Sequence, residues 1–301
     1  MREALKCLVE RLLLTAGPAA IGRMRVRGGA LVLAYHNVAP DGAQAGERTL
    51  HLPYSAFLEQ LDVIVREANV VPLASIRDAA TQRRPRVAIT FDDAYRGAVT
   101  HGVEALARKR LPATIFVAPA FLGGRSFWWD VLAEVHGGEI PARVRDEALN
   151  QLAGDDAAIR SRFPATGQAE RSIPDHARAA DEQELIEAVR HPGITLGSHT
   201  WSHPNLRALH ASRLDDELTS PVRWLRERFP GVVAALAYPY GLNDENVRNA
   251  AKRAGYTMAL RVEGGWLNHM PDDPFGIPRL NIPAGLTREG TALRLAGLFS
   301  N

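Results

Sequence analysis

The chain of 301 residues has a single cysteine, Cys7. One cysteine excludes an intramolecular disulfide and a cysteine-ligated metal cluster, and low cysteine usage is typical of a reducing compartment. The sequence also lacks a run of about 20 apolar residues, which a membrane-spanning helix would need. Neither charge is in excess, since 36 basic residues face 34 acidic ones for a formal net charge of +2. This balance predicts no nucleic-acid partner, although it would not repel an anionic glycan.

The first residues lack the unbroken apolar core of an export signal. Residues 5–16 contain Lys6, Glu10 and Arg11, whereas a signal peptide requires roughly 7–15 apolar residues in a row. The apolar residues recur instead at helical spacing, which predicts an amphipathic helix. Two interpretations stay open: the helix packs on the domain, or it docks on a membrane surface or a partner. We therefore expect a cytoplasmic or peripheral membrane protein.

What the sequence does contain is a globular composition with alternating secondary structure. Apolar residues make up 46% of the chain and charged residues 23%, which is typical of a folded protein. Short β-branched runs alternate with amphipathic stretches, and this pattern indicates a parallel α/β fold. About seven strands favour a distorted (β/α) barrel over an open sheet. The predicted strands are 30–35, 86–91, 113–117, 194–196, 233–238, 257–260 and 277–282, and the predicted helices are 54–68, 95–110, 181–190, 211–229, 243–254 and 287–298.

One stretch breaks this rhythm. Residues 123–180 are rich in Gly, Ala, Asp and Arg and contain no strand candidate. We predict that they form a partly helical insertion on the loop side of the barrel. The domain organisation is then an N-terminal helix with its lead-in over residues 1–28 and one large domain over 29–301.

The first chemically distinctive segment is Thr90-Phe-Asp-Asp93, which follows an apolar strand. Sites assemble at the carboxyl ends of parallel strands. Two adjacent carboxylates repel each other, so a compensating positive charge is expected nearby. If a metal ion supplies it, Asp93 can ligate the ion while Asp92 stays free as a base. A helix N-cap with an acidic first turn is the alternative when this segment is considered alone.

The second segment, Ser198-His-Thr-Trp-Ser-His203, follows another predicted strand. Its two imidazoles, His199 and His203, are four residues apart and can face one metal ion. Together with a carboxylate they would form a His-His-Asp site. Three protein ligands leave positions open for water and substrate, which is the catalytic arrangement.

Three weaker candidates complete the set. In Tyr238-Pro-Tyr-Gly241 the Tyr240 backbone N–H could donate to an oxyanion, and its ring could form a sugar-stacking wall. An ordinary turn is the alternative there. His36 ends the first predicted strand and should point at the same barrel mouth. Arg279 lies in the last predicted strand and could pair with a carboxylate such as Asp92, although either residue could also be an ordinary hydrogen-bonded one.

Three segments together resemble a known family in their order and spacing: Thr90-Phe-Asp-Asp93, Ser198-His-Thr-Trp-Ser-His203 and Tyr238-Pro-Tyr-Gly241. The family is that of the polysaccharide deacetylases with the NodB-homology domain, the family-four carbohydrate esterases. The resemblance runs from about residue 30 to 282. It implies a distorted barrel and metal-assisted hydrolysis of N-acetyl, sometimes O-acetyl, groups on glycans. It also implies that Asp92 is the base, that Asp93, His199 and His203 ligate a divalent metal, usually zinc with cobalt or nickel as substitutes, and that Tyr240 contributes its amide to the oxyanion.

Two departures from the family pattern bear on the remaining roles. The family often has an arginine where this chain has Ala237, and it often takes its general acid from a Leu-x-His triplet near the C-terminus. His269 lies in a Pro- and Asp-rich loop and is a poor candidate for that acid. Tyr35-His36-Asn37 resembles the bacterial exopolysaccharide branch, where a histidine at this place can serve as the acid. The resemblance thus assigns His36 as the acid and Arg279 as the partner that replaces the missing arginine.

The same branch resemblance covers Trp128-Trp129-Asp130. Trp128 and Trp129 are predicted to line the substrate groove with Tyr240 and Pro239, and the alternative is that the tryptophans anchor the insertion. The predicted partner is an acetylated glycan or aminosugar. Two other functions stay open: a deformylase or deacylase of a lipid-linked aminosugar, which the N-terminal helix would suit, and a catalytically silent glycan-binding barrel. Release of formate or acetate, together with metal content, would distinguish them.

Overall fold

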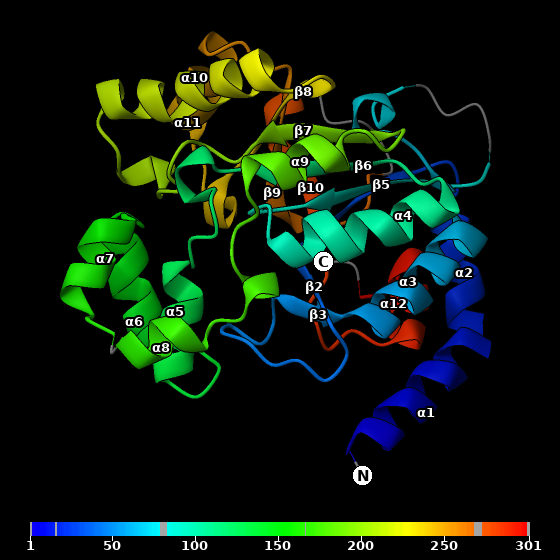
Figure 1. Cartoon of the computed structure of the whole chain (residues 1–301). Coiled ribbons are helices and arrows are strands. Elements are labelled where there is room, and N and C mark those ends of the chain that lie inside the picture. Colours follow the sequence, from blue (N-terminus) through cyan, green and yellow to red (C-terminus); the bar gives the residue numbers. More distant parts are fainter. Residues whose placement is uncertain (1, 16, 79–82, 166, 268–272, 300–301) are drawn as a thin grey trace.

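A closed barrel of parallel strands forms the centre of the protein (Figure 1). The computed structural model describes residues 2–15, 17–78, 83–165, 167–267 and 273–299, with side chains from residue 9 onward. The first strand pairs with β5 on one side and β10 on the other, which closes the ring and confirms the predicted barrel. In order around the ring, the seven strands are β1 (Ala30–Tyr35), β5 (Arg86–Phe91), β6 (Ala113–Val117), β7 (Ile194–Ser198), β8 (Val232–Ala237), β9 (Met258–Gly264) and β10 (Ile277–Asn281).

The barrel strands are mostly apolar because both of their faces are covered, although β9 and β10 also contain charged residues. All six residues of β1 are buried, and so are all five of β6. Such continuous apolar runs are typical of parallel strands with side chains inside the ring and helices outside it. The register shifts between β9 and β10 and between β7 and β8. These irregularities make the barrel a distorted one.

Three short strands lie outside the ring and were not predicted. β4 (Asn69–Val70) pairs with the first residues of β5, before β6 joins the same strand further along. β2 (Asn37–Ala39) and β3 (His51–Pro53) form a separate parallel pair just beyond the end of β1. Runs of two or three residues are too short for a periodic pattern to show in a sequence.

Amphipathic helices surround the barrel and bury their apolar residues in the core, where α12 packs on α3. The predicted helices are all present, most of them shorter by one to four residues at their ends. They are α3 (Tyr54–Glu67), α4 (Val103–Lys109), α9 (Glu182–Ala188), α10 (Ala211–Arg228), α11 (Glu245–Arg253) and α12 (Arg288–Leu295).

The helix predicted over 95–110 differs most from expectation. A π-helical segment, Ala98–Gly102, precedes α4. Gly97 at its start packs so closely on β2 that a Cβ there would lie 2.3 Å from the Val38 carbonyl oxygen. π-segments of this kind tend to occur near functional sites, and this one begins a few residues after the acidic pair Asp92–Asp93.

The N-terminal segment forms two helices where one was predicted, α1 (Arg2–Thr15) and α2 (Gly17–Arg25). α1 packs on α12, where the Thr287 hydroxyl donates to Glu10 at 2.6 Å. In Figure 1 the two helices lie at one side of the barrel, and α2 leads into the start of β1. None of the described helices is both long and apolar enough to cross a membrane.

The predicted insertion folds as a helical cluster on the opposite side of the molecule (Figure 1). No strand occurs among the described residues of 123–180, apart from one isolated bridge between Tyr95 and Ala179. The α-helices of the insertion are α5 (Trp128–Val135), α6 (Ala142–Asp146), α7 (Asp156–Arg162) and α8 (Gly167–Ser172), with a π-helical segment, Glu147–Gln151, after α6.

Candidate active site

The predicted site residues meet in one cavity of about 370 Å³ at the carboxyl ends of the barrel strands. Parallel strands deliver the residues that follow them to the same edge of a barrel, which is why segments far apart in the sequence converge here. The cavity lies between the barrel and the insertion. It is lined by His36, Glu47, Thr49, Leu50, Asp92, Asp93, Trp129, Arg145, Leu149, His199, His203, Tyr238, Tyr240, Val262 and Asn281.

Three of these side chains face one another closely enough to hold a metal ion. Asp93 Oδ1 lies 3.4 Å from His199 Nε2 and 3.3 Å from His203 Nε2, and the two Nε2 atoms are 3.1 Å apart. One ligand atom from each residue falls within 4.8 Å of the others, and all three residues are buried. The structure thus brings together the predicted Asp-His-His group.

The donor atoms of this group suit a divalent metal. The Nδ1–H of His199 donates to the Ala237 carbonyl at 2.8 Å, which leaves a lone pair on Nε2. Asp93 Oδ1 is buried without a hydrogen-bond partner among the described residues. Two imidazole nitrogens facing each other at 3.1 Å need a proton or a cation between them. Nitrogen and carboxylate ligands of this kind bind zinc and neighbouring transition metals.

The backbone at this site is strained. Five of the eight non-glycine residues with positive φ in the described chain belong to the two motif loops and the turn after β8: Asp93 at 68°, Ala94 at 53°, Thr200 at 66°, His203 at 58° and Tyr240 at 58°. A left-handed conformation costs a non-glycine residue about 1–2 kcal/mol. Residues keep such conformations where the surrounding structure fixes them, and here they aim the two ligands and Tyr240 at one point.

The second carboxylate of the acidic pair faces the last strand instead. Arg279 Nη1 donates to Asp92 Oδ1 and Nη2 to Oδ2, both at 2.7 Å. The guanidinium is fully buried, and its Nε–H donates to the Arg261 carbonyl at 2.8 Å. The predicted pairing of Arg279 with Asp92 is therefore confirmed. Asp92 Oδ2 remains 4.0 Å from His199 Nε2, so this carboxylate borders the metal group without joining it.

Charges in the cavity set the protonation states. Burial alone would raise the pKa of Asp92, but Arg279 and His199 outweigh it and hold that pKa below its ordinary value. Burial would also raise the pKa of Asp93, but the neighbouring His199 and His203 outweigh burial and lower it. Burial and the charge of His199 lower the pKa of His203 to about 3. Both carboxylates are therefore ionised at neutral pH, and the His203 imidazole is neutral.

Of the remaining predicted residues, some line the cavity and others do not. His36 follows the last residue of β1 and lines the cavity, as expected, and burial lowers its pKa. The Tyr240 ring packs edge-on against His203 with centroids 4.6 Å apart, and its hydroxyl donates to the His203 carbonyl at 3.2 Å. Pro239 is buried in the turn and is not part of the lining, so its predicted place in the wall of the groove is not observed.

The two neighbouring tryptophans have different roles in the packing. Trp129 lines the cavity, with its ring centroid 4.9 Å from that of His203. Trp128 is 1% exposed and lies outside the lining, where it packs against Trp129. Its predicted place in the groove is therefore not observed, and the anchor interpretation describes Trp128 better. Consecutive helical residues point about 100° apart, so only one of the two can face the cavity.

A buried hydrogen-bond network behind Trp129 was missed in the sequence. The Trp129 indole N–H donates to the Tyr95 hydroxyl at 2.6 Å, and that hydroxyl donates to Asp130 Oδ2 at 2.7 Å. His51 Nε2 lies 2.9 Å from Asp130 Oδ1, and the Glu47 backbone N–H donates to the same oxygen at 2.9 Å. This network ties the loop before β3 to the insertion. The Trp-Trp-Asp run was the available signal, but its partners lie 34 to 83 residues away.

Two further residues at the cavity were also missed. Arg145 of α6 and Glu47 of the loop before β3 form an ion pair of 2.7 Å, and both line the cavity. The Glu47 side chain is 4% exposed and that of Arg145 is 41% exposed. Neither residue lies in a motif. The second predicted departure from the family pattern was wrong, because Leu267-Asn-His269 has the Leu-x-His spacing. His269 itself lies outside the described residues.

A family model and a curated relative match the chain by sequence. The model for the family described as polysaccharide deacetylase matches residues 79–259. YxkH of Bacillus subtilis (strain 168), named as a polysaccharide deacetylase, is 28% identical over 112 residues, which cover 37% of this chain and 39% of that protein. The chain thus matches well under half the length of this relative.

Solved structures show the same fold at low sequence identity. BA0330 from Bacillus anthracis, described as a polysaccharide deacetylase, superposes with a TM-score of 0.63 at 17% identity, over 89% of this chain and 69% of that one. IcaB from Ammonifex degensii gives 0.61 at 17% identity, over 89% and 97%. The Streptococcus pyogenes deacetylase PplD gives 0.61 at 14% identity, over 89% and 98%.

Proposed function

The chain belongs to the polysaccharide deacetylase family, and from this premise we propose that it is a metal-dependent hydrolase that removes acyl groups, N-acetyl above all, from a sugar or bacterial polysaccharide. One observation carries the proposal. The buried Asp93, His199 and His203 group stands beside a separate Asp92–Arg279 pair inside a single cavity. A binding module would have no use for a second buried carboxylate next to a metal site, because burying such a charge is unfavourable.

Asp93, His199 and His203 would hold the ion, and zinc fits them best, with cobalt or nickel as substitutes. A divalent metal in this position would polarise an acyl carbonyl and make water acidic enough to act as a nucleophile near neutral pH. The hydrogen bond from His199 to Ala237 fixes the ring with Nε2 toward Asp93 and His203. The Tyr240 hydroxyl, bonded to the His203 carbonyl, steadies the other imidazole.

Asp92 is the proposed base. Arg279 occupies one lone pair on each carboxylate oxygen, and each oxygen retains another that can accept a proton from the attacking water. The same guanidinium fixes the plane of the carboxylate and keeps it ionised, so the base is correctly oriented and charged before substrate arrives. Arg279 is therefore a positioning residue in this mechanism.

The leaving group and the oxyanion require donors from other edges of the cavity. The Tyr240 backbone N–H is the proposed oxyanion donor, supported by the left-handed turn that places this residue in the cavity lining. His36 is the proposed general acid, because it lines the same cavity next to both carboxylates and can give a proton to the leaving nitrogen. Trp129 offers an aromatic wall for the sugar ring.

The choice of an acyl sugar as substrate rests on family membership and on the neighbours. The S. pyogenes deacetylase PplD was solved in complex with acetate, which is the product we expect from this chain. The cavity, at about 370 Å³, has room for one acylated sugar residue with the polymer extending outside.

The test is a product assay on protein stripped with a chelator and then reloaded with zinc, cobalt or nickel. N-acetylated glucosamine oligomers, an acetylated exopolysaccharide and a lipid-linked N-formyl aminosugar are supplied separately, and acetate and formate are measured by mass spectrometry. We expect acetate release that requires metal. Formate from the lipid-linked sugar alone would make the chain a deformylase, and full metal loading without release of either acid would indicate a silent glycan-binding barrel.

A further inference from the structure

Exposed apolar side chains are concentrated on the two N-terminal helices. Seven large apolar residues are substantially exposed among the described residues, and four of them lie on α1 and α2: Val9 at 47%, Leu12 at 59%, Ile21 at 54% and Met24 at 73%. The two helices make up a small fraction of the chain. Scattered apolar residues on a surface need no explanation, but a cluster marks an interaction site.

α2 is apolar on two faces. One face carries Ala19 and Gly22, which are buried against the body of the protein, as is Val26 just after the helix. Gly22 packs so tightly there that a Cβ would lie 2.0 Å from the Ala296 carbonyl oxygen. Ile21 and Met24, three residues apart on the other face, point into solvent. The helix is thus firmly seated, and packing within the chain does not account for its outer apolar face.

α1 shows the same division. Glu10 accepts a hydrogen bond from Thr287, Arg11 pairs with Glu289 at 2.9 Å, and Leu14 packs against the main core. These contacts hold the helix on α12. Val9 and Leu12 are one turn apart and exposed. The outer faces of α1 and α2 therefore each present an apolar pair to solvent.

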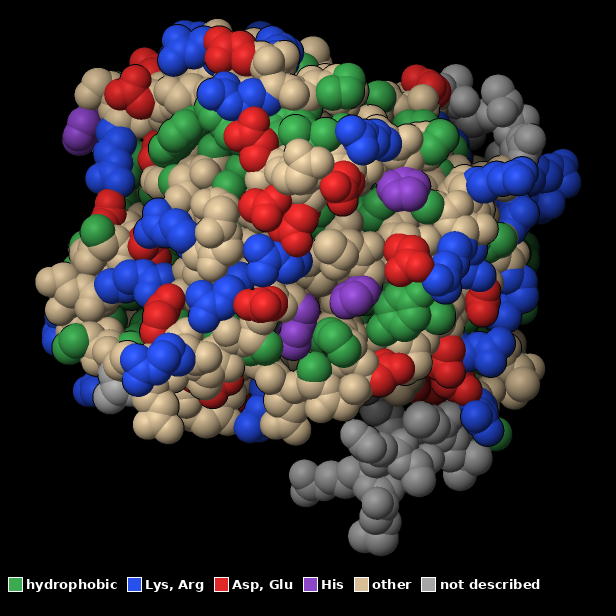
Figure 2. Space-filling model, in the orientation of Figure 1, with side chains coloured by type: hydrophobic (Ala, Val, Ile, Leu, Met, Phe, Trp, Pro, Cys, Tyr) green, Lys and Arg blue, Asp and Glu red, His purple; other side chains and the backbone are tan. Residues whose placement is uncertain are grey.

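Three arginines without an acidic partner among the described residues lie next to this surface. Arg25 and Arg27 are exposed at the end of α2, and the Gly28 backbone N–H donates to the Arg83 carbonyl at 3.0 Å, which brings an exposed third arginine alongside. None of the three forms an ion pair with any described residue. Figure 2 shows Lys and Arg side chains along the edge of the molecule where Figure 1 has α2. In a chain with a net charge of only +2, this is a local excess.

We propose that the outer faces of α1 and α2, with Val9, Leu12, Ile21, Met24, Arg25, Arg27 and Arg83, form a docking surface for an anionic lipid bilayer. Apolar side chains that enter the headgroup region, flanked by arginines that meet lipid phosphates, are typical of helices that lie in a membrane interface. A second copy of the chain is the less favourable occupant, because a twofold contact through this surface would bring the same arginines face to face.

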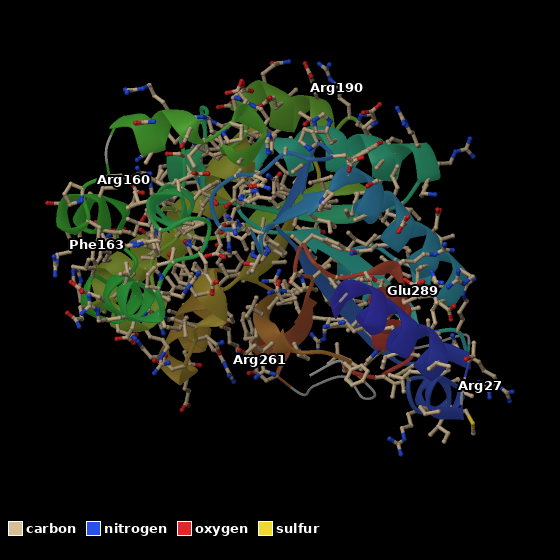
Figure 3. The ribbon with its side chains drawn as sticks, turned by 90° about the horizontal axis from the view of Figure 1, so that it is seen from below. Arg27, Arg160, Phe163, Arg190, Arg261 and Glu289 are labelled. Atoms are coloured by element: carbon tan, nitrogen blue, oxygen red, sulfur yellow. The ribbon has the colours of Figure 1, made fainter. Side chains whose placement is uncertain are left out.

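The position of the surface is compatible with an accessible cavity. α2 leads into the amino end of β1, whereas the cavity opens at the carboxyl ends of the strands. In Figure 3 Arg27 lies at the opposite end of the molecule from Arg160 and Phe163 of the insertion. A bilayer bound at α1 and α2 would therefore leave the insertion and the cavity free to receive substrate.

Co-sedimentation with vesicles tests this surface without reference to the chemistry of the cavity. The full chain is mixed with vesicles of phosphatidylcholine and phosphatidylglycerol in equal parts, and separately with phosphatidylcholine alone. We expect binding to the anionic vesicles that weakens as salt rises. The combined Arg25→Gln and Arg27→Gln variant should bind on the order of 30-fold more weakly. The combined Leu12→Glu and Met24→Glu variant should bind roughly 100-fold more weakly.

Val135→Glu is the matched control, because Val135 is 50% exposed on α5 of the insertion, and it should bind as the unchanged chain does. Circular dichroism confirms that each variant is folded. Equal binding to both vesicle types, or equal weakening by Val135→Glu, would overturn the proposal. An absence of binding to either vesicle type would also overturn the proposal. Light scattering would then show whether the chain is a monomer or a dimer, and a dimer that Met24→Glu dissociates would make a second copy the occupant of this surface.

Discussion

The cavity has two walls of different construction. The barrel wall consists of strand ends and strained turns, and its charged groups are buried and paired: Asp92 with Arg279, and Asp93 with two imidazoles. The insertion wall consists of helix side chains, with Trp129 held by a hydrogen-bond network and Arg145 partly exposed in an ion pair. The register of the strands fixes the positions of the residues in the barrel wall. Contacts between side chains alone fix the positions of the residues in the insertion wall. We infer that the first performs the chemistry and the second recognises the substrate.

The largest effect on metal affinity and turnover is expected from a substitution in the barrel wall. His199→Ala removes one of the three proposed metal ligands and leaves a void beside Asp93 and His203. Metal affinity should collapse, and turnover should fall at least ~10³-fold, because the chemistry that the ion supplies is worth several kcal/mol. Elemental analysis of the dialysed protein and a turnover assay measure the two effects. Undiminished metal content would remove His199 from the ligand set.

Arg279→Leu tests the same wall through stability. The substitution leaves Asp92 buried without its partner, which should lower the free energy of unfolding by about 3–5 kcal/mol. Because the pKa of Asp92 is lowered in the folded protein, the pair stabilises the fold above pH ~4, and this contribution is lost as the pH falls further. Urea unfolding at neutral and acidic pH should show the gap between the two proteins narrowing on acidification.

The double variant Asp92→Asn with Arg279→Leu is the control for this prediction. With no carboxylate left unpaired, it should regain part of the lost stability. Additive losses from the two substitutions would contradict the coupling of Asp92 and Arg279.

A smaller effect on stability is expected from Asp130→Asn, a substitution behind the insertion wall. It keeps the shape of the side chain but removes the carboxylate. The amide cannot accept from both Tyr95 and His51 as the carboxylate does, so the free energy of unfolding should fall by about 1–3 kcal/mol. Trp129 should also lose its fixed position, which would raise KM several-fold while metal content stays unchanged. An effect on kcat alone would place Asp130 in the chemistry and contradict the division between the walls.

The smallest effect on stability should come from Arg145→Gln at the cavity lip. Because the Arg145 side chain is 41% exposed, its pair with Glu47 should contribute less than ~1 kcal/mol to stability. KM should change more than kcat, by up to roughly tenfold, since the residue lines the cavity without touching the metal group. A fall in kcat equal to that of the barrel-wall variants would erase the distinction between the two walls.

The same contrast explains what the sequence could predict. The barrel wall follows from local patterns, since each apolar run forms a strand and the polar residues directly after it must lie at the carboxyl edge. Asp92, Asp93, His199 and His203 could be found in this way, and the ring closure then brings them together. Arg279 was found only as a weak candidate because it lies on β10, which is separated from β5 and Asp92 by β1, so no local pattern links the two residues.

The insertion wall could not be read from the sequence because it depends on contacts between distant segments. His51 and Asp130 are 79 residues apart, and Glu47 and Arg145 are 98 apart. No spacing rule links such pairs. Trp128 and Trp129 were equally good candidates, since the start of α5 determines which of the two faces the cavity. Left-handed residues such as Thr200 also carry no compositional signal, because glycine would be expected there.

Asp92→Asn tests the central claim most directly, with metal content and turnover measured on the same preparation. The neutral amide matches the carboxylate in shape but cannot accept a proton from water, while Asp93, His199 and His203 are untouched. The account predicts a full complement of metal and an almost complete loss of turnover. Full activity in this variant, or loss of the metal along with the activity, would contradict the separation of base and ligands on which the proposed mechanism depends.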